Sequence, residues 1–221
     1  MSQTVVIDPG HGGSDPGAVS GAAQEKDLVL RFSKLLAKEL EARGLTALLT
    51  RDTDVTLSLA SRTAIERAAK AACCVSCHMD AGPVSASGMT VWLHSQAPAS
   101  YEEWAKDTLR ELRKVGFTTN RAVEVNRGYR GNPKVNYAWN RDTVSPSMLL
   151  ELGFVTNPDN LREMEEKGTG YAQAVARAIC HFLGVEDRPQ DKPSEPEVDY
   201  RALYEALSER VDQTIKILKG E

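Results

Sequence analysis

Short apolar segments alternate along this chain with longer segments in which apolar residues recur every three or four positions. The short segments are bounded by glycine, proline or polar residues, as is typical of buried strands, and they cover residues 4–7, 46–50, 73–77, 88–94 and 148–152. The longer segments have the one-sided apolar stripe of a helix, and they cover residues 25–43, 59–72, 98–115 and 171–183. Because parallel neighbouring strands need long crossover connections, this alternation predicts an α/β fold with three layers, α/β/α, and a mostly parallel sheet.

Composition and charge limit the classes of partner. With 221 residues, of which 41% are hydrophobic, the chain can bury one sizeable core. The formal net charge of -4 gives no basic excess for binding phosphate backbones or anionic lipids, so we expect neither nucleic acid nor a membrane as a partner. No apolar run reaches the roughly 18 residues of a membrane span, and the first residues lack the pattern of a signal peptide. We therefore expect synthesis in the cytoplasm without a signal peptide.

The C-terminal part of the sequence differs in composition from the rest. We expect a main domain over residues 1–184, a linker rich in proline and charge over 185–198, and an amphipathic helix over 199–221. An isolated helix of that length is marginal in water. It is therefore predicted to pack on the main domain or to mediate homo-oligomerisation, and a frayed tail is the equal alternative.

Side chains that can bind metals lie at the ends of separate predicted strands. His11 and His78 follow the first and third strands, Glu151 ends the last strand, and Glu25 begins the first helix. Because ligands gather beyond the carboxyl ends of parallel strands, we expect the strand-end side chains to meet at one edge of the sheet. Two imidazoles and a carboxylate match the three protein ligands of a catalytic zinc. Taken singly, each residue has a simpler explanation, such as a surface histidine or a glutamate in the first turn of a helix.

Five motifs taken together carry a resemblance to a known enzyme family. They are residues 5–18 (VVIDPGHGGSDPGA), Glu25-Lys26-Asp27, Thr50-Arg51-Asp52 followed by Leu59 and Arg62, Ser76-x-His78-x-Asp80-Ala81, and residues 150–157 (LELGFVTN). In this order and at these spacings the chain resembles, from residue 4 to about 184, the zinc-dependent N-acetylmuramoyl-L-alanine amidases of the amidase_3 type. The resemblance implies a twisted sheet flanked by helices, in agreement with the predicted layers.

The resemblance also implies a role for each matching residue. His11, Glu25 and His78 are the implied ligands of one Zn²⁺ per chain, and Glu151 is the implied catalytic acid and base. The implied reaction is hydrolysis of the amide between N-acetylmuramic acid and L-alanine, so peptidoglycan is the implied partner. Zinc would lower the pKa of its water towards about 7, and Glu151 would pass the proton to the leaving amine. The alternative for Glu151 is a structural carboxylate paired with an arginine such as Arg141.

Candidate substrate contacts are Asp80 and a polar loop over residues 117–141. Family members commonly carry Asn where this chain has Asp80, and Ala-Asp where it has Cys73-Cys74, so substrate preference is the property that these departures affect. In the loop, Arg127 offers a cation for stem-peptide carboxylates. The aromatic residues that offer ring faces to sugars are Tyr129, Tyr137 and Trp139.

Three non-hydrolytic interpretations compete with this assignment. Residues 74–78 read Cys-Val-Ser-Cys-His, the C-x-x-C-H pattern of haem attachment, although a cysteine in a buried strand is usually a small apolar residue. A structural zinc held by Cys73, Cys74 and Cys77 is disfavoured because alternate strand residues point to opposite faces. A peptidoglycan-binding or regulatory module with a vestigial zinc has no use for Glu151.

Two biological settings fit the predicted chemistry. Without an export signal, the chain is expected to be a phage endolysin that reaches the cell wall after release by a holin-type membrane protein. A bacterial autolysin or sporulation amidase is the second setting.

Overall fold

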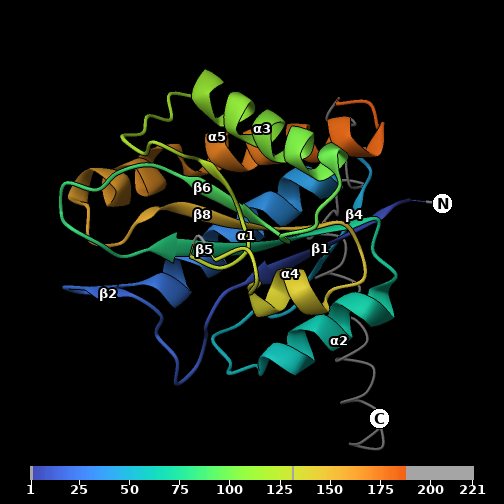
Figure 1. Cartoon of the computed structure of the whole chain (residues 1–221), viewed down its shortest axis with the longest axis horizontal. Helices are drawn as coiled ribbons and strands as arrows, with labels where there is room; N and C mark the ends of the chain where they lie inside the picture. The colour runs from blue at the N-terminus through green and yellow to red at the C-terminus, as the bar shows by residue number, and fades with distance from the viewer. Residues whose placement is uncertain (1, 131, 188–221) are drawn as a thin grey trace, which may run out of the picture. The chain divides into compact units, whose positions relative to one another are not determined.

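The computed structural model describes residues 2–130 and 132–187 and contains a six-stranded sheet covered by helices (Figure 1). The strands of the sheet are β1 (Thr4–Pro9), β4 (Thr46–Leu49), β5 (Cys73–Asp80), β6 (Thr90–Leu93), β7 (Val125–Arg127) and β8 (Ser147–Phe154). A small separate hairpin consists of β2 (Val19–Ser20) and β3 (Ala23–Gln24). The helices are α1 (Glu25–Glu41), α2 (Leu59–Ala69), α3 (Ala99–Lys114), α4 (Ala138–Asp142) and α5 (Pro158–Leu183).

The strand order confirms the predicted mostly parallel sheet. In the order β4-β1-β5-β8-β6-β7, the first four strands are parallel, β6 runs antiparallel to β8, and β7 is parallel to β6. Figure 1 shows α3 and α5 on one face of the sheet and α2 and α4 on the other. Helix α1 contributes Phe32, Leu36 and Leu40 to the same core as α3 and α5. The three predicted layers are therefore confirmed.

The two faces of the sheet differ in character. Cys73, Val75 and Cys77 of β5 face the large apolar core beneath α1, α3 and α5. Cys74 faces the other side, where the core is small. Because strand residues alternate between faces, Ser76 and His78 also lie on that second side. The sheet thus presents a polar surface near the carboxyl ends of its strands, on the side of α2 and α4.

Helix α5 begins earlier than the sequence predicts. The prediction starts this helix at residue 171, just after Gly168 and Gly170, and glycine has a low helix propensity. The structure starts it at Pro158, and the Asn157 side chain caps it by accepting from the backbone N–H groups of Asp159 and Asn160. Packing of this helix against α1 and α3 offsets the low helix propensity of its glycines.

The C-terminal segment cannot be compared with the structure. The predicted linker over residues 185–198 lies mostly outside the described residues, and the predicted helix over 199–221 lies wholly outside them. The domain boundaries and homo-oligomerisation through that helix therefore stay predictions. None of the helices within the described ranges has the length and apolar character needed to cross a bilayer.

Candidate metal centre and active site

His11 sits on a loop whose backbone is held by two buried arginines. Its φ of 57° lies in the left-handed region, which is uncommon for a residue other than glycine. Arg51 donates from Nε to the carbonyl of Pro9 at 3.0 Å and from Nη2 to that of Gly10 at 2.7 Å. Arg62 donates to the carbonyl of His11 itself. These bonds offset the local strain and fix the direction in which the imidazole points.

The His11 ring lies between two carboxylates. Its Nδ1 is 2.8 Å from Oδ2 of Asp15, and its Nε2 is 3.1 Å from Oε1 of Glu25. Burial lowers the pKa of His11, but hydrogen bonding and attraction from Glu25 and Asp15 outweigh it, so the pKa is raised overall. A carboxylate on Nδ1 orients the ring so that Nε2 is directed towards a ligand.

Glu25 is the first residue of α1 and is 3% exposed. Its Oε1 lies 2.9 Å from Nδ1 of His78 and accepts from the N–H of Met79 at 3.0 Å, while Oε2 accepts from the N–H of Ala18 at 2.8 Å. Burial raises the pKa of Glu25, but hydrogen bonds from His11 and His78 outweigh it and lower the pKa well below its usual range. The carboxylate is therefore ionised.

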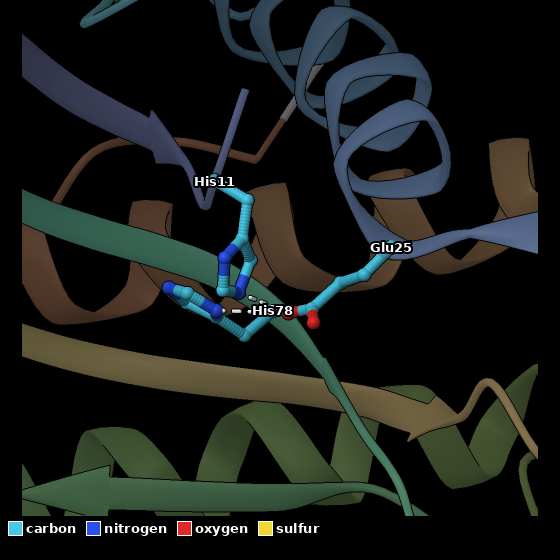
Figure 2. A group of neighbouring side chains, drawn as sticks. All are labelled: His11, Glu25 and His78. Carbon is cyan, nitrogen blue, oxygen red and sulfur yellow. Dashed lines mark hydrogen bonds and ion pairs between the residues drawn. The ribbon is translucent and has the colours of Figure 1, made fainter. Parts of the chain in front are cut away.

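The side chains of His11, Glu25 and His78 converge on one point although they come from the loop after β1, from α1 and from β5 (Figure 2). One nitrogen from each ring and one carboxylate oxygen all lie within 4.8 Å of one another. Glycine makes room for them, because a Cβ on Gly10 would lie 2.3 Å from Cε1 of His78. Two imidazoles and one ionised carboxylate are a donor set that zinc accepts, so the residues present fit that metal.

Glu151 lies in β8 directly beside His78 of β5. The two residues are paired in the parallel register, so their side chains project from the same face. Glu151 is 6% exposed, and its Oε2 has no hydrogen-bond partner among the described residues. Burial, followed by repulsion from Asp80 and Glu25, raises the pKa of Glu151 well above its ordinary value. A buried carboxyl group without a partner, next to metal-binding side chains, indicates a chemical role.

The structural alternative for Glu151 is wrong. Arg141 donates to Asp142, the next residue in the chain, at 2.6 and 2.7 Å. The Arg141 guanidinium is therefore paired with Asp142 and is not the partner of Glu151.

A cavity of about 620 Å³ opens beside the metal-binding side chains, on the side of the sheet that carries α2 and α4. Its polar lining includes His11, His78, Asp8 and Ser76. The larger apolar and aromatic residues around it are Leu57, Leu59, Tyr129, Val135, Tyr137, Trp139 and Leu149. Ring faces and aliphatic side chains next to a few polar groups are typical of a small-ligand site.

The predicted substrate residues differ in their positions relative to the cavity, and Tyr137 is among those that line it. Tyr129 lines the cavity, and Trp139, although 5% exposed and packed in the small core, lies at its wall. Arg127 does not line it, because its guanidinium donates to the carbonyl of Ala97 and pairs with Glu102 at 2.9 Å. The Arg127 guanidinium therefore already has partners within the chain, and its contact with substrate stays a prediction.

Asp80 also lies outside the cavity lining. Its carboxylate pairs with Arg121, whose guanidinium also stacks 4.4 Å above the ring centroid of Phe154. The Asp80 carboxylate therefore already has a partner within the chain, and its contact with substrate stays a prediction. The residue acts on the site through charge, since it raises the pKa of Glu151.

A buried hydrogen-bond network around Asp8, beneath the His11 loop, was not predicted from the sequence. Asp8, 2% exposed, accepts from Thr50 at 2.6 Å, from Ser76 at 2.7 Å and from Arg62 at 2.8 Å. The available signal was an aspartate directly after an apolar strand, which is costly to bury unless partners satisfy it. No sequence pattern names those partners.

The cysteines are free and buried. Cys73 and Cys77 face the large core and Cys74 faces the small one, so the three thiols cannot meet at one ion. Burial raises the pKa of Cys77 to about 12. The haem and structural-zinc interpretations therefore have no support, because they need accessible or convergent thiols.

Comparison with known proteins gives one family. The sequence profile of Amidase_3, described as N-acetylmuramoyl-L-alanine amidase, matches residues 5–181. A Staphylococcus aureus protein named "Probable cell wall amidase LytH" is 39% identical over 191 residues, which are 84% of this chain and 58% of that protein. The chain thus spans little more than half the length of this curated relative.

Solved structures agree with the fold. The N-acetylmuramoyl-L-alanine amidase AmiC2 of Nostoc punctiforme has a TM-score of 0.70 at 30% identity, over 82% of this chain and 97% of that one. The CwlD amidase of Clostridioides difficile, solved in complex with the GerS lipoprotein, has a TM-score of 0.74 at 26% identity, over 84% of this chain and 100% of that one.

Proposed function

This chain belongs to the Amidase_3 family of N-acetylmuramoyl-L-alanine amidases, and from that membership we propose that it is a zinc-dependent amidase of peptidoglycan. The bond broken is the amide that joins the lactyl group of N-acetylmuramic acid to L-alanine. One observation carries the proposal: Glu151, buried and without a hydrogen-bond partner among the described residues, lies beside the His11, Glu25 and His78 cluster.

His11, Glu25 and His78 would hold one zinc ion per chain. A zinc ion bound there supplies a Lewis acid for the scissile carbonyl and lowers the pKa of a bound water towards about 7. The chain prepares the site in two ways. Asp15 orients the His11 ring, and backbone N–H groups hold Glu25.

Glu151 would move the proton of the reaction. As base, its carboxylate takes a proton from the attacking water while the water oxygen bonds to the carbonyl carbon. As acid, it gives that proton to the nitrogen of L-alanine while the carbon–nitrogen bond breaks. The raised pKa of Glu151 suits the acid step, and a nearby divalent cation would favour the ionised form needed for the base step.

The cavity would receive the substrate on the side of α2 and α4. Sugar rings are amphipathic and stack on aromatic faces, which Tyr129 and Tyr137 provide. The aliphatic side chains of Leu57 and Leu59 extend that surface.

Release of fragments from purified cell walls tests the proposal. We expect the zinc-loaded chain to release peptides with a free N-terminal L-alanine, and a chelator to stop the release. Glu151→Gln should keep the zinc and lose about 10²- to 10⁴-fold of the rate, the usual contribution of a positioned general acid or base. If Glu151→Gln is as active as the parent, the assigned role is wrong. Binding to walls without release of peptides supports the binding-module alternative instead.

For the biological setting we propose a bacterial amidase over a phage endolysin. The support is that the relative named a probable cell wall amidase is a protein of the bacterium S. aureus. Expression of the chain with and without a hole-forming membrane protein tests this choice. Lysis only when the hole-former is present would support the phage setting and count against the bacterial one.

A further inference from the structure

A tight turn beside the cavity carries an arginine in a strained conformation. Tyr129 and Asn132 close the turn by donating to each other's carbonyl groups, at 3.2 Å and 2.8 Å. Arg130 lies between them with a φ of 47°, in the left-handed region that non-glycine residues rarely adopt. Strained residues of this kind cluster at functional sites.

The turn directs the Arg130 side chain towards the aromatic wall of the cavity. The guanidinium carbon lies 5.5 Å from the centroid of the Tyr129 ring, within the range of a cation–π contact. The Tyr129 ring packs edge-on against Tyr137 at 4.7 Å between centroids, and both tyrosines line the cavity together with His11 and His78. Arg130 itself does not line the cavity, but its guanidinium lies against Tyr129, which does.

Arg130 differs from the other arginines of residues 117–130 in having no anionic partner. Arg121 pairs with Asp80, and Arg127 pairs with Glu102. Within the described residues Arg130 forms no ion pair, and its side chain is exposed.

The chemistry of the substrate indicates which anion such a cation would bind. The carboxyl group of the lactyl ether is consumed in the scissile amide, and the hydroxyl and acetamido groups of the sugar are neutral. The carboxylates that remain belong to the stem peptide. A guanidinium binds a carboxylate through two parallel, charge-assisted hydrogen bonds.

We propose that Arg130 binds a free carboxylate of the stem peptide, on the leaving-amine side of the scissile bond, and selects peptides with that carboxylate over peptides in which it is amidated. The inference rests on the amidase function proposed above. It gives the cationic role that sequence analysis assigned to Arg127 to a residue three positions later, whose guanidinium lies against Tyr129 of the cavity lining.

Two synthetic N-acetylmuramoyl dipeptides test the inference. In the first peptide the second residue carries a free carboxylate. In the second peptide that same group is a carboxamide. The C-terminal carboxyl group is amidated in both peptides. We expect the kcat/KM of the zinc-loaded parent chain to be about 10- to 100-fold higher on the carboxylate peptide than on the carboxamide peptide. This ratio corresponds to the usual contribution of a hydrogen bond to a charged group. Arg130→Gln should reduce this ratio to nearly one. A parent without a preference, or a preference that survives in Arg130→Gln, overturns the inference.

The ratio separates substrate binding from a field effect on Glu151. If Arg130 acted only by shifting the pKa of Glu151, Arg130→Gln would change both rates equally and leave the ratio intact. Lys134→Gln is the matched control, because it removes one exposed positive charge from the same loop. It should keep the preference of the parent.

Binding measurements keep the test informative without turnover. In a Glu151→Gln background, calorimetry should show that Arg130→Gln weakens binding of the carboxylate peptide and leaves the carboxamide peptide unchanged. Equal binding of the two peptides in that background overturns the inference. If the parent releases L-alanine peptides from neither the dipeptides nor purified walls, the amidase proposal itself fails. Cleavage of both dipeptides at equal rates ends only the role of Arg130.

Discussion

Two groups of three side chains of metal-binding type lie within the described residues, and their surroundings differ. The first is His11, Glu25 and His78 at the edge of the sheet. The second is formed by Asp107 and Glu111 of α3 with His181 of α5. In the second group the carboxylates already have cationic partners, which are Arg110, Lys114 and Arg177. In the first, no lysine or arginine of residues 2–130 and 132–187 pairs with Glu25.

The difference shows that neighbouring charge, as well as ligand type, decides whether such a group suits a metal. In the second group, Glu111 pairs with Arg177 at 3.0 Å, and His181 lies 2.8 Å from Asp107, so the side chains tie α5 to α3. A divalent ion there would meet three nearby cations and would have to displace them. At the first group the partners of the ionised Glu25 within residues 2–130 and 132–187 are imidazoles and backbone N–H groups, so a cation is attracted.

Removing one histidine from each group gives the largest expected contrast. His78→Ala should reduce the zinc content from one ion per chain to none and abolish amide hydrolysis, because two ligands hold zinc poorly. His181→Ala should leave both unchanged. Atomic absorption on the purified variants, with wall hydrolysis in parallel, measures both effects. Loss of zinc from the His181→Ala variant would mean that zinc binds at the second group, which contradicts the assignment of the site to His11, Glu25 and His78.

The carboxylate behind His11 should have an intermediate effect. Asp15→Asn removes the negative charge that orients the Nδ1 side of the ring, and we expect zinc affinity to fall about 10- to 100-fold. Competition with a chromophoric chelator measures the affinity. Asp52→Asn is the matched control, since Asp52 is exposed on a neighbouring loop. An equal loss of affinity in both variants would assign the effect to net charge rather than to orientation.

The smallest effect concerns stability and belongs to the second group alone. Arg177→Met leaves Lys114 as the cationic partner of the buried Glu111. We expect the free energy of unfolding to fall by about 1–2 kcal/mol. This is less than the cost of breaking a fully buried ion pair, because solvent screens the exposed parts of both cations. Denaturant titration measures it. Zinc content should not change, and a loss of zinc would break the distinction between the two groups.

The same variant should change the response to acid. Burial raises the pKa of Glu111, but Lys114 and Arg177 outweigh it, so the folded-state pKa lies below its ordinary value of 4.5. A depressed carboxyl pKa contributes stability above the unfolded value and loses it as the pH falls through the folded value. The parent should therefore lose stability below about pH 4.5, and Arg177→Met should lose less. Equal losses in the two proteins would show that Glu111 does not carry this effect.

The layers of the fold were predicted correctly, and the positions of the strand-end residues His11, His78 and Glu151 agree with the expected meeting at one edge of the sheet. Both predictions rest on local patterns, because strand and helix periodicities predict the layers and strand ends in a parallel sheet meet at one edge. Glu25 lies at the start of a helix, and its place in the site was implied by the resemblance. The start of α5 was predicted 13 residues late, because the helical pattern was read only from Tyr171, although Asn157 caps the helix before Pro158. The substrate-binding roles of Asp80 and Arg127 stay predictions, and the structure adds that each residue is paired within the chain. A charged residue in a polar loop shows what it can bind, but not whether another part of the chain already binds it.

The sequence by itself determined the order of the elements and the chemical types gathered at the edge of the sheet. Only the tertiary structure decided which charges are satisfied: Arg127 by Glu102, Asp80 by Arg121, and Asp8 by Arg62. It also showed that Glu151 Oε2 has no partner among the described residues. The physical reason is that ion pairing and desolvation depend on distances between segments far apart in the chain, which neither periodicity nor spacing encodes.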